Sequence, residues 1–88
     1  MYSPFRDYCV YNIYNINKHV KIVGEITTQR LSKNTLFLKI KDETNSIDVI
    51  LFNANQTLKK NQKYIIEGRV QYNNFKYQII AKNIYLTS

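Results

Sequence analysis

A period-two alternation of apolar and polar residues runs through most of the chain after residue 19. It is clearest in residues 20–28, where Val20, Ile22 and Ile26 alternate with lysine, glutamate and threonine. Successive side chains of a β-strand point to opposite faces of a sheet, so this pattern predicts a half-buried strand. Four more segments with strand-like sequences follow, at residues 35–42, 47–52, 63–72 and 75–86. The chain is therefore predicted to be all-β.

The connections between these segments are short. Residues 31–34 and 43–46 carry turn-forming side chains, and residues 53–62 break the alternation and are predicted to form one short helix. Asparagine tolerates positive φ, so Asn73-Asn74 is predicted to be a two-residue hairpin turn. That turn would place Tyr72 opposite Phe75.

The number of strands and the chain length together limit the architecture. A β-sandwich normally has about seven strands and more residues than the 88 present here. An open five-stranded sheet would leave its edges exposed, whereas a closed barrel removes them. The prediction is a five-stranded Greek-key barrel of the OB-fold type, formed by residues 20–88, with the short helix between strands 3 and 4.

The first nineteen residues have a different pattern, in which an aromatic residue recurs at every third position. The aromatic residues are Tyr2, Phe5, Tyr8, Tyr11 and Tyr14. One interpretation is that residues 1–19 pack on an open end of the barrel and bury their rings there. The other is that residues 2–16 dock on a second copy of the chain or on a larger protein partner. The sequence favours the first interpretation and leaves the second open.

The composition argues against several classes of function. The chain has 13 Lys and Arg against 6 Asp and Glu, with one His and one Cys. A single cysteine and a single histidine cannot supply a zinc site, and two glycines cannot form a phosphate-binding loop, so we expect no metal, cofactor, small-molecule substrate or catalytic activity. No apolar run approaches the roughly 18 residues of a membrane span. We expect an intracellular protein of the cytoplasm or nucleoid, with no membrane partner.

A net charge of +7 attracts polyanions, and the outward faces of the predicted strands carry aromatic rings among cations. A flat ring can stack on an unpaired base while cations neutralise the neighbouring phosphates. A duplex hides the faces of its bases, so such a surface suits single strands. The candidate nucleic-acid-binding residues are Arg30, Phe37, Lys39, Lys41, Asp48 and Phe52, with Tyr72, Phe75 and Tyr77 as a second aromatic wall.

Three short runs carry a resemblance to a known family. They are Gly24-Glu-Ile-Thr-Thr-Gln-Arg30, Phe37-Leu-Lys-Ile-Lys-Asp42 and Ile47-Asp-Val49. Over residues 20–86 the chain resembles the anticodon-binding type of OB-fold found in aspartyl- and lysyl-tRNA synthetases, the large subunit of exonuclease VII and single-strand binding proteins. The resemblance implies that Arg30 contacts nucleotides, that Phe37 stacks on them, and that a base-reading position falls on Asp48.

These observations predict a stand-alone OB-fold protein that binds single-stranded nucleic acid with low sequence specificity, and they favour DNA over RNA. Two alternatives remain open at this stage. The first is a structural OB subunit that mediates protein assembly in a complex of the replication, repair or telomere type. The second is a module that binds tRNA or another RNA.

Overall fold

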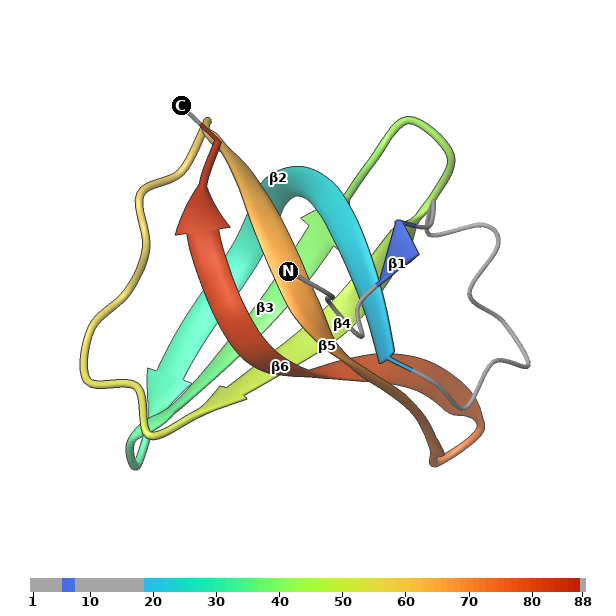
Figure 1. Ribbon diagram of the computed structural model, residues 1–88. Helices are drawn as coiled ribbons and strands as arrows, with labels where there is room; N and C mark the ends of the chain where they lie inside the picture. Colours follow the sequence, from blue (N-terminus) through green and yellow to red (C-terminus); the bar gives the residue numbers. More distant parts are fainter. Residues whose placement is uncertain (1–5, 8–18, 88) are drawn as a thin grey trace, which may run out of the picture.

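Strands β2 to β6 curve into a closed barrel, which Figure 1 shows in the computed structural model of residues 6–7 and 19–87. The strands are β1 (Arg6–Asp7), β2 (His19–Ser32), β3 (Thr35–Lys41), β4 (Ser46–Phe52), β5 (Lys63–Asn73) and β6 (Lys76–Leu86). Their order in the sheet is β1-β2-β3-β4-β6-β5, and β2 also pairs with β5, which closes the barrel. The predicted five-stranded barrel of the OB-fold type is confirmed.

Strand β2 closes the barrel because its two halves pair with different neighbours. Its first half pairs with β5 and its second half with β3, and Glu25 is opposite both Lys63 and Lys41. The backbones come close together at this change of partner. A Cβ atom on Gly24 would lie 2.6 Å from the carbonyl oxygen of Lys41, so only glycine fits without displacing β3.

The interior of the barrel is filled by the apolar residues of the alternating pattern. The fully buried side chains are Val20, Ile22, Leu36, Ile40, Val49, Ile66, Val70 and Ile79. Full burial of such a side chain contributes about 1.5–3 kcal/mol relative to leaving it in water. The alternation read from the sequence therefore sets which face of each strand is inside the barrel and which is on its surface.

The short helix predicted for residues 53–62 is wrong, and the segment instead forms an irregular strap between β4 and β5. The backbone amide and carbonyl of Leu58 form hydrogen bonds with the side-chain amide of Gln29 and not with other backbone groups of a helix. The Nε2 atom of Gln29 donates to the Leu58 carbonyl at 2.8 Å, and its Oε1 accepts from the Leu58 amide at 3.0 Å. These bonds compete with helical ones, and the left-handed residues Asn53 (φ 61°) and Asn61 (φ 64°) interrupt helical geometry near each end.

The hairpin between β5 and β6 differs from the prediction in its register. Its turn residues are Asn74 (φ 51°) and Phe75 (φ 64°), and Tyr72 pairs with Tyr77 instead of with Phe75. Two consecutive residues with positive φ form a tight turn that matches the twist of a hairpin. The predicted pairing is therefore wrong by two residues, a shift that leaves every side chain on its predicted face because the strand period is two.

Core packing explains this register. In the observed pairing Val70 lies opposite Ile79, and both are almost fully buried. The predicted turn would have placed Tyr77 opposite Val70 and moved Ile79 away from this position. Left-handed geometry costs a residue such as Phe75 roughly 1–2 kcal/mol, a cost that is comparable to the stabilisation from burying one aliphatic side chain.

The hairpin between β2 and β3 also has a two-residue turn, formed by Lys33 (φ 49°) and Asn34 (φ 63°). It is shorter than the predicted loop at residues 31–34, because Leu31 and Ser32 belong to β2. Figure 1 shows the β2–β3 turn at the lower left and the β5–β6 turn at the lower right. The two turns therefore lie on opposite sides of the molecule.

The prediction for residues 1–19 concerns a segment of which the structure describes only Arg6, Asp7 and His19. Arg6 lies opposite Val20 and Asp7 opposite Lys21 in a short parallel pairing of β1 with β2. Residues 1–5 and 8–18, which hold the predicted row of aromatic side chains, lie outside the described residues. Packing of residues 1–19 on the barrel remains a prediction. In the part of the chain that the structure describes, no helix has the length and hydropathy needed to cross a membrane.

Candidate functional site

Cross-strand pairing brings four of the predicted binding residues together on the outer face of β2, β3 and β4. Arg30 of β2 is opposite Phe37 of β3. Two residues farther along β3, and on the same face, Lys39 is opposite Asp48 of β4. These side chains border a groove with a volume of about 320 Å³. We call it the Phe37 groove and define it by Arg30, Phe37, Lys39, Asp48, Ile50 and Gln78.

An arginine lies over the aromatic ring in this groove. The guanidinium carbon of Arg30 is 4.6 Å from the centroid of the Phe37 ring, and Phe37 is partly exposed. This cation–π contact contributes about 0.5–1 kcal/mol at an exposed site. Both groups are flat, and both are surfaces on which unpaired bases stack in nucleic-acid complexes. The groove therefore offers a stacking platform made of a ring and a guanidinium instead of a bare ring.

Asp48 is held by two lysines. The Nζ atom of Lys76 donates to its Oδ2 at 3.1 Å, and the Nζ atom of Lys39 lies 4.0 Å from its Oδ1. All three side chains are partly exposed, so each ion pair contributes at most about 1 kcal/mol. In this structure the carboxylate at the predicted base-reading position thus occupies two cations that could otherwise contact phosphates.

The mutation Asp48→Asn is expected to strengthen binding of a single-stranded oligonucleotide by about 2- to 30-fold. The mutation removes a negative charge from the groove and releases Lys39 and Lys76 for phosphates, at about 0.2–1 kcal/mol for each pair. Fluorescence anisotropy at low salt measures the change. The control is Glu43→Gln, which removes the same charge from an exposed residue outside the groove. Weaker binding by Asp48→Asn would contradict this and would indicate that the carboxylate contacts a base.

The structure places the other predicted residues outside the Phe37 groove. Lys41 lies farther along β3 opposite Ser46, and Phe52, 55% exposed, lies opposite Thr35 beside the β2–β3 turn. Phe75 is 92% exposed at the tip of its hairpin. The rings of Tyr72 and Tyr77 contact each other edge to face on β5 and β6, with centroids 4.8 Å apart. Tyr72, Phe75 and Tyr77, the predicted second wall, therefore do not line the Phe37 groove.

Sequence reasoning missed two residues of this region, Gln78 and Lys76. Gln78 reaches the groove because β4 and β6 pair in parallel and place it opposite Asp48. Lys76 comes from the same strand and reaches the same carboxylate. The pairing joins strands separated by β5 in the chain, so no local pattern reveals it. The only available signal was the polar character of Gln78 between apolar neighbours.

The positive charge of the chain is not confined to this groove. Lys59, Lys60 and Lys63 are exposed on the strap and at the start of β5. These lysines add to a general attraction for polyanions, which falls with salt. The groove adds what charge alone does not supply, namely flat stacking surfaces at a fixed position among the cations.

The outer face of β5 and β6 away from the hairpin has a different character. Glu67 is only 8% exposed and accepts hydrogen bonds from the hydroxyl of Tyr85 and from Nδ2 of Asn83, the latter at 3.1 Å. The hydrogen bond to Glu67, followed by burial and by the negative charge, raises the pKa of Tyr85 above its usual value. Both hydrogen bonds go to Oε1 of Glu67, and the carboxylate has the same sign of charge as a phosphate, so this part of the face does not suit a phosphate.

Solved structures with the same fold come from larger proteins and from an isolated domain. Asparaginyl-tRNA synthetase of Pyrococcus horikoshii, complexed with asparaginyl-adenylate, has a TM-score of 0.78 at 16% identity and covers 92% of this chain. A replication protein A heterotrimer bound to single-stranded DNA has a TM-score of 0.73 at 11% identity and covers 80%. The second OB-fold domain of replication protein A from Methanococcus maripaludis has a TM-score of 0.77 at 22% identity and covers 92%.

The shares of these proteins that this chain covers differ widely. It spans 22% of the synthetase, 57% of the replication protein A chain and 94% of the isolated archaeal domain. No curated protein sequence matches the chain. Residues 20–87 match the model of the family described as the OB-fold nucleic acid binding domain, which confirms the resemblance inferred from the sequence. The chain belongs to this family of OB-fold nucleic-acid-binding domains.

Proposed function

We propose that this protein binds single-stranded nucleic acid across the Phe37 groove. The observation that carries the proposal is the contact of Arg30 with Phe37, at 4.6 Å, in the same groove as Lys39. Stacking of a base on an aromatic side chain contributes about 1–3 kcal/mol, and the cations neutralise phosphates on either side. The Phe37 ring thus binds the base of a nucleotide, and the cations bind its phosphate.

The ligand is a single strand because the groove presents flat groups. Bases in a duplex are stacked on each other, so their faces cannot reach Phe37 or the Arg30 guanidinium. Reading a duplex from its major groove requires a helix or a two-stranded ribbon that enters it. The described residues contain no helix, and the site lies on the barrel wall.

Low sequence specificity and a preference for DNA are parts of the same proposal. Stacking tolerates every base because all bases have a flat π face. Asp48, at the base-reading position, is engaged by Lys39 and Lys76. The preference for DNA draws on the likeness to a replication protein A heterotrimer bound to single-stranded DNA and to an isolated domain that this chain spans almost completely.

We propose further that the protein acts inside the cell, in the cytoplasm or nucleoid, as a binding module without catalytic activity. The chemistry of the Phe37 groove supports the proposed lack of catalytic activity. Its charged groups are Arg30, Lys39 and Asp48, and the one carboxylate among them is paired with lysines instead of being poised as a base. Such a set binds an anion and orients a base.

A titration with matched single-stranded DNA, single-stranded RNA and duplex DNA at two salt concentrations tests the proposal. Single-stranded DNA should bind most tightly and the duplex most weakly. At about −0.7 per phosphate, the slope of the logarithm of the affinity against the logarithm of salt should lie between about −0.7, with Arg30 alone on a phosphate, and about −2, if the strand also draws Lys39 and Lys76 from Asp48. Equal binding of duplex and single strand would overturn the proposal, and tighter binding of RNA would favour the RNA-binding alternative.

A structural subunit of a larger complex is a second candidate. Three apolar or aromatic side chains on β2 and β6 are well exposed: Val23 at 42%, Tyr85 at 45% and Leu86 at 49%. One similar structure is a heterotrimer. Size-exclusion chromatography with light scattering distinguishes the two functions. A stable oligomer that ignores a thirty-nucleotide single strand would favour assembly, and a monomer that binds it would favour the Phe37 groove.

A further inference from the structure

A second and larger groove lies on β5 and β6, next to the start of β2. Its volume is about 840 Å³, and its lining includes His19, Arg69, Tyr72, Tyr77, Ile80 and Lys82. We call it the Arg69 groove. It is separate from the set of residues that defines the Phe37 groove, and the predicted binding residues Tyr72 and Tyr77 belong to it.

The two grooves meet along the pairing of β4, β6 and β5. Ile50 of the Phe37 groove lies opposite Ile80 of the Arg69 groove. Gln78 lines the first groove and Gln71 the second, and Nε2 of Gln78 lies 3.5 Å from Oε1 of Gln71. Because paired residues such as Ile50 and Ile80 line the two grooves, a nucleic-acid strand that leaves the Phe37 groove across β4 and β6 enters the Arg69 groove.

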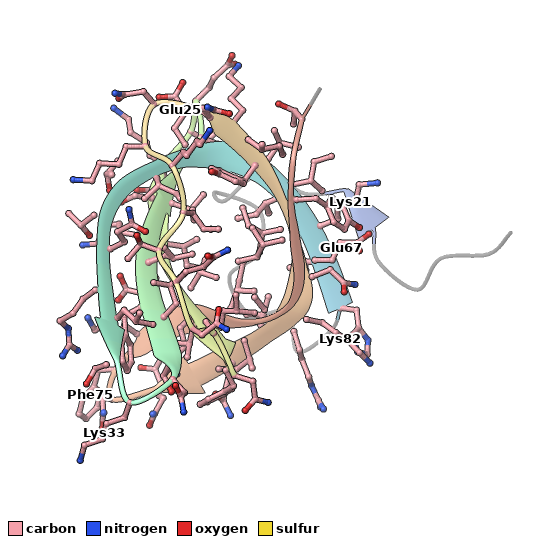
Figure 2. The ribbon with its side chains drawn as sticks, turned by 90° about the vertical axis from the view of Figure 1, so that its left-hand side faces the viewer. Lys21, Glu25, Lys33, Glu67, Phe75 and Lys82 are labelled. Carbon is pink, nitrogen blue, oxygen red and sulfur yellow. The ribbon has the colours of Figure 1, made fainter. Side chains whose placement is uncertain are left out.

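The Arg69 groove repeats the chemical combination found in the first. Arg69 and Lys82 are exposed cations, and Lys82 projects from the outside of the barrel (Figure 2). Tyr72 is 57% exposed, and its edge-to-face contact with Tyr77, at an interplanar angle of 63°, fixes the orientation of its ring. Tyr72, Arg69 and Lys82 all line this groove. A groove with an exposed ring and two cations suits a nucleotide better than an apolar peptide, because the charges match a phosphate backbone.

We propose that the Arg69 groove is a second subsite for the same single strand, with phosphates on Arg69 and Lys82 and a base on Tyr72. This inference rests on the proposed function of the Phe37 groove. One row of cross-strand pairs joins the two subsites, and it runs through Arg30, Phe37, Ile50, Ile80 and Arg69. Four strand spacings of about 4.8 Å give this row a length of about 19 Å. Single strands occupy about 4–16 nucleotides on one OB-fold, which leaves room for both subsites.

Oligothymidines of four and twelve nucleotides test the second subsite. The double variant Arg69→Gln with Lys82→Gln should bind the twelve-nucleotide strand roughly tenfold more weakly at low salt, with a salt slope shallower by about 1.4 for two lost phosphates. At about 3.4 Å per nucleotide a stacked four-nucleotide strand is about 14 Å long. It is shorter than the row that joins the two subsites and should therefore lose much less. The matched control is Lys59→Gln with Lys60→Gln, which removes the same charge from exposed positions on the strap.

Each outcome of this experiment has a separate meaning. If the double variant and the strap control bind both strands alike, the second subsite does not exist. If in that case Phe37→Ala still weakens binding, the proposed function of the Phe37 groove stands. If the wild-type protein binds neither oligothymidine, the proposed function itself fails. Loss confined to the longer strand supports the second subsite, and circular dichroism establishes that each variant is folded.

Discussion

The mutation Phe37→Ala is expected to weaken binding of a single-stranded oligonucleotide by about 5- to 150-fold, the range that corresponds to 1–3 kcal/mol for one stacked base. The ring of Phe37 lies on the outer face of β3, under the guanidinium of Arg30 at 4.6 Å. Its removal takes away both the stacking surface and the group that positions the arginine. The salt slope should stay nearly unchanged, because the mutation removes no cation.

A control on another part of the same sheet separates this loss from a general loss of structure. Val23 is 42% exposed on β2, where that strand pairs with β5, so Val23→Ala removes apolar surface outside the groove. It should leave affinity within about twofold. If Phe37→Ala and Val23→Ala bind equally well, then Phe37 does not stack on a base, and net charge alone explains any binding.

The mutation Gly68→Ala is expected to lower the free energy of unfolding by about 1–3 kcal/mol, the usual cost of an overpacked core position. Gly68 lies between β2 and β6, opposite Val20 and Ala81. A Cβ atom there would lie 2.3 Å from the carbonyl oxygen of Ile80 and 2.9 Å from the Cα atom of Ala81. Both neighbours are backbone, so β6 itself must move. The φ angle of Gly68 is not positive. Glycine is therefore needed at this position because there is no space for a side chain, and not because of the backbone conformation.

Thermal or urea denaturation followed by circular dichroism measures this effect. For a domain of this size each kcal/mol shifts the melting temperature by about 4–8 °C, so a drop of roughly 5–20 °C is expected. Gln71→Ala, an exposed position on the same strand, is the control and should shift the melting temperature by only a few degrees. A Gly68→Ala protein as stable as the control would show that β5 and β6 can separate at no cost.

Much of the fold can be predicted from the sequence because burial follows the strand period. Side chains of one parity, such as Ile22, Leu38 and Ile66, are buried, and this fixes which residues face outward. The outward position of Phe37 and its proximity to Arg30 follow from that parity and from the short connection between β2 and β3. Local rules suffice here because the interacting residues lie on neighbouring strands of one hairpin.

The features that sequence reasoning missed depend on contacts between distant segments. The strap is not helical, since Gln29 bonds to Leu58 across 29 positions of the chain. The β5–β6 register follows the packing of Ile79 against Val70, and no local signal distinguishes it from a shift of two residues. The lysine pair on Asp48 and the border between the two grooves arise from the parallel pairing of β4 with β6.

The central claim is that a single strand lies across the outer face of β3 and β4. Amide chemical shifts from nuclear magnetic resonance, recorded while a twelve-nucleotide oligothymidine is added, test this claim residue by residue. The claim predicts that the largest changes occur at Arg30, Phe37, Lys39 and Gln78, with smaller changes at Val23 and Tyr85. The claim would be contradicted if the amide shifts of Phe37 and Lys39 did not change and the largest shift changes occurred at Val23, Ile65 and Tyr85.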